Sequence, residues 1–316
     1  MRVDVVVNRN AHRLGDEATL RSGIAAAARR GGAYLHETRS LAELRVIAHD
    51  IAARGTDAVV LAGGDGSYMA GMSAIAQAFS EAGKRLPRMA FAPGGTVCTS
   101  ARNLGMCGRR GAWAERIVSA VCRDTARVVV HSTLRVRDGS GAHRIGFIFG
   151  AGLVVRFFDA YYAGPRQGVG SAARIVGRIF AGSLVGSAFA RSVLEPRPCT
   201  LTLDGCAQPT RGWSLVVASV FRNLGLHMLV TYRAGEDTDR FHVVASGQSA
   251  ARLGSQLPRV LTGLPLRGEP RVDALARSLH LSFHGTATGG YVLDGDVFTA
   301  SEVHAEAGPR VELLVA

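Results

Sequence analysis

The sequence is nearly without lysine and poor in aromatic residues. Lys84 is the only lysine among 37 lysine and arginine residues, so 37 − 1 = 36 of them are arginine. Aromatic residues make up 6% of the chain and do not alternate with the basic ones. A surface that stacks the bases of a single strand needs such side chains, so we expect no nucleic-acid partner.

Paired cysteines and long apolar runs are also missing. The five cysteines form no CxxC pair, which gives no sign of structural zinc and favours a reducing, cytoplasmic compartment. The longest apolar run, residues 179–190, is about a dozen residues long, whereas a membrane span needs roughly 20. The N-terminus does not read as a signal peptide. We therefore expect a cytoplasmic protein that meets lipid from the inner face of the membrane.

The excess of positive charge has two explanations. The net charge is +12 and the isoelectric point about 10.5. Such a balance suits an anionic partner, such as an acidic membrane surface or a phosphorylated metabolite. It equally suits a compositional bias toward arginine.

The first 125 residues alternate between short apolar runs and amphipathic helices. This alternation predicts a parallel sheet with helices on both faces, an α/β nucleotide-binding domain of residues 1–125. The predicted strands are 2–8, 33–38, 57–63 and 88–93. The predicted helices are 14–30, 40–53, 67–79 and 113–121.

The remainder reads as short strands joined by turns. We expect residues 126–316 to form a mainly antiparallel β-sandwich domain, and we include the apolar segment 147–158 among its strands. One helix, 171–194, interrupts the pattern. It carries Arg174, Arg178 and Arg191 around an apolar body, so it either lies on an anionic bilayer or packs on the β domain.

A glycine loop follows the predicted strand 57–63. It reads Gly63-Gly64-Asp65-Gly66-Ser67, and its glycines let backbone N–H groups approach phosphate oxygens at the start of a helix. The spacing matches neither the Walker loop nor the dinucleotide fingerprint. Asp65 either caps a tight turn or takes a proton or a magnesium ion beside the phosphates.

A second loop follows the next predicted strand. Gly94, Gly95 and Thr96 could wrap a polar ligand, and Arg102 could reach a phosphate. Because the carboxyl ends of parallel strands meet at one edge of a sheet, we expect both loops to lie at a single ligand site. Read alone, this stretch is a turn with an exposed arginine.

Two further patterns carry possible ligands. Asp294 and Asp296 flank Gly295, and a strand continuing through that glycine would place both carboxylates on one side, whereas a hairpin turn would not. His280 and His284 share one face of a predicted strand. Because the sequence shows no third ligand nearby, we interpret the pair as partly exposed histidines of a sheet rather than as metal ligands.

In this order, the motifs resemble the diacylglycerol kinase and sphingosine kinase superfamily of lipid kinases, which is related to the NAD kinases. The matching segments are VVVNRNAHRLG at 5–15, LAGGDGS at 61–67, APGGTVCTSARNLG at 92–105 and LDGD at 293–296. The segment NLGLHMLVTYRAGEDTDR, 223–240, is similar to the one that carries an acidic motif in this family.

The resemblance implies an ATP- and Mg²⁺-dependent kinase acting on a lipid hydroxyl, such as that of a diacylglycerol-like or sphingoid-like lipid. Anionic phospholipid is the expected surface, and the lipid would enter between the two domains. Asn8 would lie near the nucleoside, and Arg102 would support the second loop. The implied phosphate-binding residues are Gly63, Gly64, Gly66, Ser67, Gly94, Gly95 and Thr96.

The resemblance leaves the general base open between Asp294, with Asp296 beside it, and Asp65. Asp65 could instead hold magnesium, and Asp237 corresponds weakly to an acid that holds a structural magnesium in some members. Arg9 replaces the usual proline, and Cys98-Thr99 replaces Asn-Asp. These departures favour a catalytically weak lipid- or nucleotide-binding protein as the alternative. A soluble small-molecule kinase of the NAD-kinase type is a third possibility.

Overall fold

The structure is a computed structural model that describes residues 1–11, 14, 17–106, 110–164, 168–284 and 289–316. The chain divides into two compact units, one of residues 1–131 with 310–316 and one of residues 132–309. The boundary expected at residue 125 thus differs by 131 − 125 = 6 residues from the one in the structure. Residues 310–316, expected in the second domain, fall in the first unit.

The first unit is built on a six-stranded sheet whose strands are apolar and β-branched. All neighbouring pairs in it are parallel except the last, β19 with β5. In spatial order the strands are β2 (Tyr34–Thr38), β1 (Val3–Asn8), β3 (Ala58–Gly63), β4 (Arg88–Pro93), β19 (Val311–Val315) and β5 (Arg127–His131). The central strands β1 and β3 are buried almost throughout, as a sheet covered on both faces requires.

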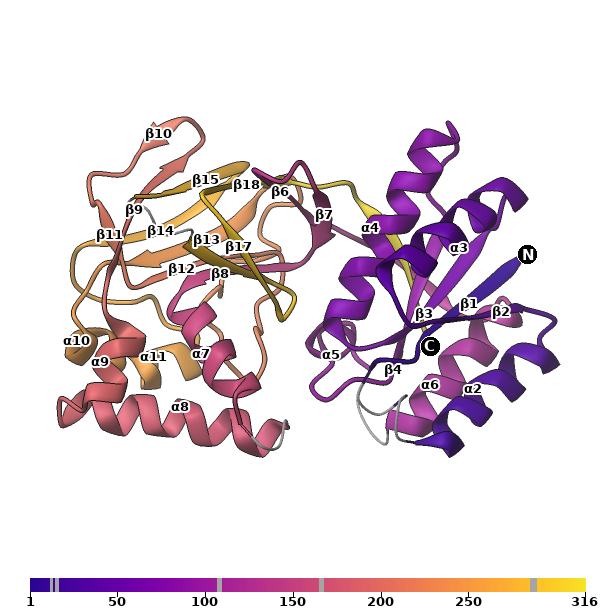
Figure 1. Ribbon diagram of the computed structural model, residues 1–316, viewed down its shortest axis with the longest axis horizontal. Coiled ribbons are helices and arrows are strands. Elements are labelled where there is room, and N and C mark those ends of the chain that lie inside the picture. The colour runs from indigo at the N-terminus through magenta and orange to yellow at the C-terminus, as the bar shows by residue number, and fades with distance from the viewer. Residues whose placement is uncertain (12–13, 15–16, 107–109, 165–167, 285–288) are drawn as a thin grey trace. The chain divides into compact units, whose positions relative to one another are not determined.

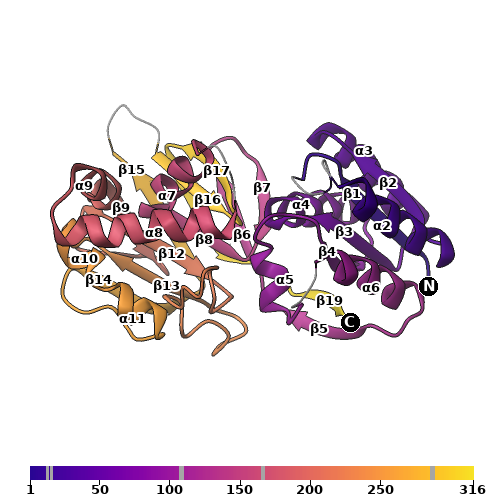
Figure 2. The same cartoon turned by 90° about the horizontal axis from the view of Figure 1, so that it is seen from below.

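Helices cover both faces of this sheet (Figures 1 and 2). On one face, α2 (Ala18–Arg30) and α6 (Arg110–Cys122) join a core with alternate residues of the strands. On the other, α3 (Leu41–Arg54) packs beside α4 (Asp65–Glu81), and Tyr68 of α4 stacks on Phe91 with ring centroids 4.3 Å apart. A short helix, α5 (Thr99–Asn103), follows β4. The predicted α/β domain with a parallel sheet is confirmed.

The C-terminal strand β19 returns to the first unit and lies between β4 and β5. Leu313 is opposite Met89 in a parallel pair, and Glu312 forms ion pairs with Arg85 and, at 3.3 Å, with Arg88. The first unit is therefore completed by residues more than 170 positions away from its other strands.

The second unit contains two antiparallel sheets, which confirms the expected antiparallel β fold. The first consists of β10 (Cys206–Ala207), β9 (Arg197–Leu203), β15 (Ser278–Phe283), β18 (Glu302–Ala307), β6 (Leu134–Asp138) and β7 (His143–Gly146), with β11 (Gly212–Trp213) paired to β9. The second consists of β14 (Arg271–Ala276), β13 (Phe241–Ser246), β12 (Leu215–Ser219), β8 (Ile148–Gly152), β16 (Gly289–Leu293) and β17 (Asp296–Ala300). Every residue of β12 and β13 is buried, so this second sheet is covered on both faces.

Helices pack on one face of the second sheet. They are α7 (Leu153–Tyr162), α8 (Val169–Leu184), α9 (Ala188–Leu194), α10 (Ala250–Gly254) and α11 (Leu257–Leu261). The expected helix 171–194 is two helices, broken near Gly186, whose φ is +65°. The segment 153–158, expected as strand, is the start of α7. Gly152 ends β8 with a φ of +68° and lies too close to the Ser214 carbonyl for any side chain.

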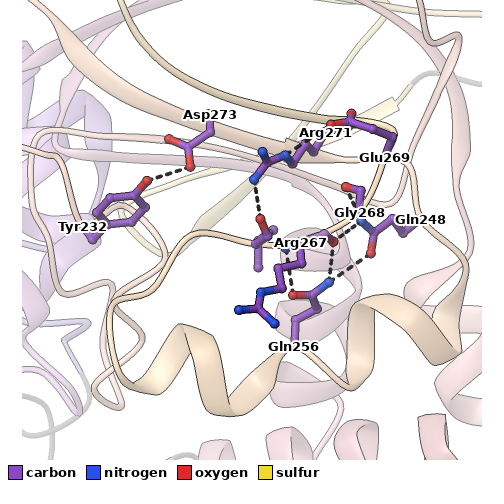
Figure 3. A network of polar contacts seen from close by, with 9 residues as sticks. Tyr232, Gln248, Gln256, Arg267, Gly268, Glu269, Arg271 and Asp273 are labelled. Atoms are coloured by element: carbon purple, nitrogen blue, oxygen red, sulfur yellow. Dashed lines mark hydrogen bonds and ion pairs between the residues drawn. The ribbon is translucent and has the colours of Figure 1, made fainter.

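Buried amides fix the segment that precedes β14 (Figure 3). The Gln248 Nε2 group donates to the carbonyls of Arg267 at 2.5 Å and Gly268 at 2.6 Å. Gln256 donates to the Arg267 carbonyl at 2.6 Å and accepts from the Arg267 N–H at 3.0 Å.

Among the described residues, no single helix is long and apolar enough to cross a membrane. One pair of helices in this part of the chain, α8 with α9, is long and apolar enough only when the two are taken together, and it is bent by 104°.

Candidate active site

Three parallel strands of the first unit end at the same edge of the sheet. The ends of β3 and β4 are paired, with Gly63 opposite Pro93, and β1 runs beside β3. Three loops leave this edge, and they carry Asn8, Gly63 to Ser67 and Gly94 to Thr96. The structure therefore places Asn8 and the two predicted glycine loops at one edge of the sheet.

The two glycine loops touch through their backbones. The Gly94 N–H donates to the Gly63 carbonyl at 2.7 Å. A Cβ atom on Gly95 would lie 2.4 Å from the Cα of Gly64, and one on Gly94 would lie 2.5 Å from the Leu14 side chain. A side chain at Gly95 would collide with the Gly64 backbone, so the two loops can approach this closely only with glycine at that position.

Asp65 joins the two loops. Its carboxylate accepts hydrogen bonds from the N–H groups of Thr99 at 2.7 Å and Ser100 at 2.8 Å. It thereby caps α5, the helix after the second loop, although Asp65 itself begins α4. Burial raises the pKa of this carboxyl, while the two N–H groups and the charge of Arg102 oppose the rise. A carboxylate offers about four lone-pair positions, so two bonds leave it able to meet a cation or a proton.

Asn8 and Ser67 tie the end of β1 to the first turn of α4. The Asn8 amide donates to the Ser67 hydroxyl at 2.9 Å, and the Gly64 N–H donates to the same oxygen at 3.3 Å. Arg9, where the family has proline, forms an ion pair with Glu37 at 2.6 Å. In the remainder of this loop, His12, Arg13 and Gly15 lie outside the described residues.

The second loop departs from the family pattern at a strained position. Cys98 has a φ of +52°, in the left-handed region, and its side chain is buried. Asparagine adopts this conformation with less strain than cysteine, so the backbone is more strained with Cys98 here than with the asparagine of the family pattern. Thr96 is partly buried just before it, and Arg102 is exposed on α5.

Asp294 lies in a hairpin turn of the second unit. Asp294 and Gly295, with φ of +47° and +94°, connect β16 to β17, so the strand does not continue through Gly295. Asp294 is buried and Asp296 is exposed, so of the two alternatives that the sequence leaves open for this segment the structure has the hairpin turn. The Asp294 carboxylate accepts hydrogen bonds from the N–H groups of Phe147, at 3.0 and 3.1 Å, and Ile148, at 2.9 Å.

Asp237 lies in the loop between β12 and β13. Its carboxylate accepts from the Asp239 N–H at 2.8 Å and lies 3.5 Å from the Arg240 guanidinium. Within the described part of the chain, neither Asp237 nor Asp65 belongs to a group of three possible metal ligands. Mg²⁺ commonly takes only one or two carboxylates and completes its shell with water and phosphate oxygens, so Asp65 fits that role beside a nucleotide.

A buried charge network in the second unit escapes sequence analysis. Asp138 accepts from the Tyr291 hydroxyl at 2.6 Å and from Arg144 at 2.7 Å. Burial alone would raise the pKa of Asp138, but hydrogen bonds from Ser140 and Tyr291 and the charge of Arg144 lower it to about 2. The same burial and the Asp138 hydrogen bond raise the pKa of Tyr291. Asp138 and Arg144 lie on the paired strands β6 and β7, but Tyr291 is 153 positions from Asp138, so no spacing in the sequence joins all three residues.

A second network joins Tyr232, His242 and Asp273. Figure 3 shows the Tyr232 hydroxyl donating to Asp273, at 2.8 Å, and His242 Nε2 lies 2.8 Å from the other carboxylate oxygen. The Arg233 N–H donates to His242 Nδ1 at 3.3 Å, which places the imidazole proton on Nε2. Burial lowers the pKa of His242, and burial with the Asp273 contact raises the pKa of Tyr232 to about 12.

Comparisons with known proteins agree with the resemblance. Residues 2–130 match the family model described as the diacylglycerol kinase catalytic domain. A comparison with curated protein sequences finds no match.

Three solved structures from Bacillus anthracis str. Sterne share the fold across the whole chain. One, of a diacylglycerol kinase, has a TM-score of 0.64 at 14% identity, covering 100% of this chain and 97% of its own. Two others, assigned as diacylglycerol kinases, have TM-scores of 0.70 and 0.71 at 16% and 17% identity, covering 100% of this chain and 96% and 97% of theirs. Residues 2–130 thus match the model of the diacylglycerol kinase catalytic domain, in a chain that shares the fold of these bacterial proteins throughout.

Proposed function

We propose that the protein is an ATP- and magnesium-dependent lipid kinase, which phosphorylates the hydroxyl of a diacylglycerol-like or sphingoid-like lipid. The observation that carries the proposal is the backbone contact between Gly64 and Gly95, with Asp65 bound to the amides that follow the second loop. A pair of glycine loops closed in this way presents N–H groups to phosphate oxygens and keeps side chains out.

In this proposal the first unit holds the nucleotide. N–H groups of Asp65 to Ser67 and of Thr96 bind the phosphates, and α4, a helix of 17 residues, directs its positive N-terminal end toward them. Arg102 supplies a guanidinium near the second loop. Bound Mg²⁺ would neutralise part of the phosphate charge, and the Asp65 carboxylate would hold the ion.

The lipid hydroxyl must lose a proton as it is phosphorylated. Asp65 and Asp294 are the two candidates for the base. The raised pKa of Asp65 brings its carboxylate closer to the value that favours proton acceptance near neutral pH. Asp294 is buried and accepts N–H hydrogen bonds at both carboxylate oxygens. To act as the base it must accept the proton at a lone pair that these bonds do not use.

Helix α8 is the proposed membrane-facing element. Its exposed positions include Arg174, Arg178 and Leu184, and Val185, just after it, is 81% exposed. The segment 169–194 contains no acidic residue. A helix with exposed arginines and apolar side chains binds the surface of an anionic bilayer.

Phosphorylation of a lipid panel tests the enzyme assignment. Purified protein, radiolabelled ATP and magnesium are mixed with micelles of diacylglycerol, sphingoid bases and other hydroxylated lipids. We expect label in one of these lipids. Binding of ATP without any labelled lipid would instead support the second candidate, a nucleotide-binding protein with little turnover, which the strain at Cys98 favours.

Vesicle sedimentation tests the membrane surface. We expect the protein to bind vesicles containing anionic phospholipid and the double variant Arg174→Glu/Arg178→Glu to bind them at least fivefold less. Arg29→Glu/Arg30→Glu, at the exposed end of α2 in the other unit, is the matched control and should bind as the wild type does. Equal loss in both variants would show that net charge, not α8, governs binding.

A further inference from the structure

The sheet that contains β15 and β18 has one buried face and one exposed face. Along β15, Leu279 and Leu281 are buried, and along β18, Val303 and Ala305 are buried. Because side chains alternate along a strand, the residues between them lie on the opposite, outer face. Those residues are His280, Ser282, Glu302 and His304.

Two histidines on this outer face are directly opposite each other. His280 and His304 are cross-strand partners, and their rings stack with centroids 3.9 Å apart and planes 6° apart. Glu302 lies two residues before His304, and its carboxylate is 3.4 Å from His280 Nε2. One ligand atom from each of these three residues lies within 4.8 Å of the other two.

The histidine nitrogens are available as ligands. His280 Nε2 is buried, and no residue in the described parts of the chain forms a hydrogen bond with it. His304, on the same face, is exposed.

The surrounding charges do not exclude a cation. Arg135 and Arg137 lie on the adjacent strand, but both lie near the carboxylate of Glu306, at 3.4 and 3.9 Å. This carboxylate offsets part of their repulsion, and Glu302 adds a negative charge at the cluster itself.

We propose that His280, Glu302 and His304 form a binding site for a divalent transition metal, with Zn²⁺ as the preferred ion. Two imidazoles and a carboxylate with an open fourth position are a known zinc ligand set, whereas Mg²⁺ prefers oxygen ligands alone. Zinc requires its ligand atoms about 2.0–2.2 Å from the ion, so the two rings must tilt out of their parallel stack.

The site is independent of the kinase chemistry. His280 and His304 belong to the second unit, and none of the three ligands takes part in the proposed transfer of phosphate. Failure of the proposed function would therefore leave this inference untouched.

Calorimetric titration of the full chain with ZnCl₂ alone, without nucleotide, tests the site. The protein carries Cys206→Ser so that this exposed thiol does not compete. We expect one Zn²⁺ per chain with micromolar affinity, weakened at least thirtyfold by His304→Asn and by His280→Asn. MgCl₂ should give no binding at the same concentrations.

His49→Asn is the matched control, because His49 is an exposed histidine 3.7 Å from a glutamate, Glu81, and belongs to no group of three possible ligands among the described residues. It should bind zinc as the parent does. If either histidine variant melts differently from the parent without metal, Glu302→Gln replaces it, with an expected loss of at least tenfold. Unchanged affinity in all variants of the cluster, or equal loss in His49→Asn, would overturn the proposal.

Discussion

Gly95 lies against Gly64 so closely that a Cβ atom on it would stand 2.4 Å from the Cα of its partner. The two residues come from loops about thirty positions apart, and each follows a strand of the same parallel sheet. This contact explains why both loops carry glycine pairs: the backbones must meet for the N–H groups to face one ligand.

Gly95→Ala should separate the two loops. The added methyl group cannot fit beside the Gly64 backbone, so we expect ATP affinity to fall at least tenfold, measured by calorimetry. Gly177→Ala is the control, since a Cβ at Gly177 on α8 meets nothing within 4 Å. Normal ATP affinity in Gly95→Ala would show that the contact does not shape the nucleotide site.

Asp65→Asn should reduce turnover at least a hundredfold, as removal of a base or a metal ligand does. The asparagine side chain has one oxygen that can accept a hydrogen bond from either the Thr99 or the Ser100 N–H. Its NH₂ group faces the other N–H, which loses its acceptor. Hydrogen exchange of those two amides should therefore accelerate as well.

Asp204→Asn is the matched control for this substitution. Asp204 accepts from two successive amides, those of Arg277 at 2.9 Å and Ser278 at 2.8 Å, in an exposed turn of the other unit. Turnover of Asp204→Asn should stay within twofold of the wild type. A comparable loss in both variants would mean that Asp65 acts only through stability.

Asp294→Asn should affect both stability and turnover. The buried carboxylate binds the Phe147 and Ile148 amides, and an unsatisfied buried group costs about 1–3 kcal/mol of unfolding free energy. If Asp294 is also the base, kcat falls at least a hundredfold at temperatures where the variant is fully folded. Denaturant unfolding and kcat are measured on the same sample, and Asp296→Asn, exposed in the same hairpin, should leave both nearly unchanged.

Asp138 should make the second unit sensitive to acid. Its pKa is lowered to about 2 in the folded protein, from an ordinary value near 3.8, so its stabilising contribution is complete above about pH 4 and is lost as the pH falls toward 2. A pKa shift of this size corresponds to about 2 kcal/mol of unfolding free energy. Asp138→Asn should flatten the decline of unfolding free energy between pH 4 and 2, and an equally steep decline would contradict the assignment.

Sequence alone could predict the first unit because its signals are local. Buried parallel strands such as Val3–Asn8 and Ala58–Gly63 are apolar throughout, and the helices between them carry their own periodicity. The two glycine loops follow from the same pattern, since loops after parallel strands share an edge. The position of these loops at one edge of the sheet can therefore be predicted from the sequence.

The missed features depend on tertiary contacts. Val311–Val315 carries no sign that it will pair with Met89, because that partner is set by packing. A run such as Leu153–Phe158 suits either a strand or a helix, and the sequence does not show that the chain turns at Gly152, where φ is +68°. His304 could not be joined to His280 from spacing, because their register depends on the turns between β15 and β18.

Competition between acceptors tests the central claim most directly. Purified protein receives radiolabelled ATP and magnesium together with a total lipid extract in micelles and an equal concentration of NAD. The account predicts that label enters the lipid phase, that it does so at least a hundredfold more slowly with Asp65→Asn, and that NAD stays unlabelled. Label in NAD, or none in any lipid while ATP is bound, would contradict it.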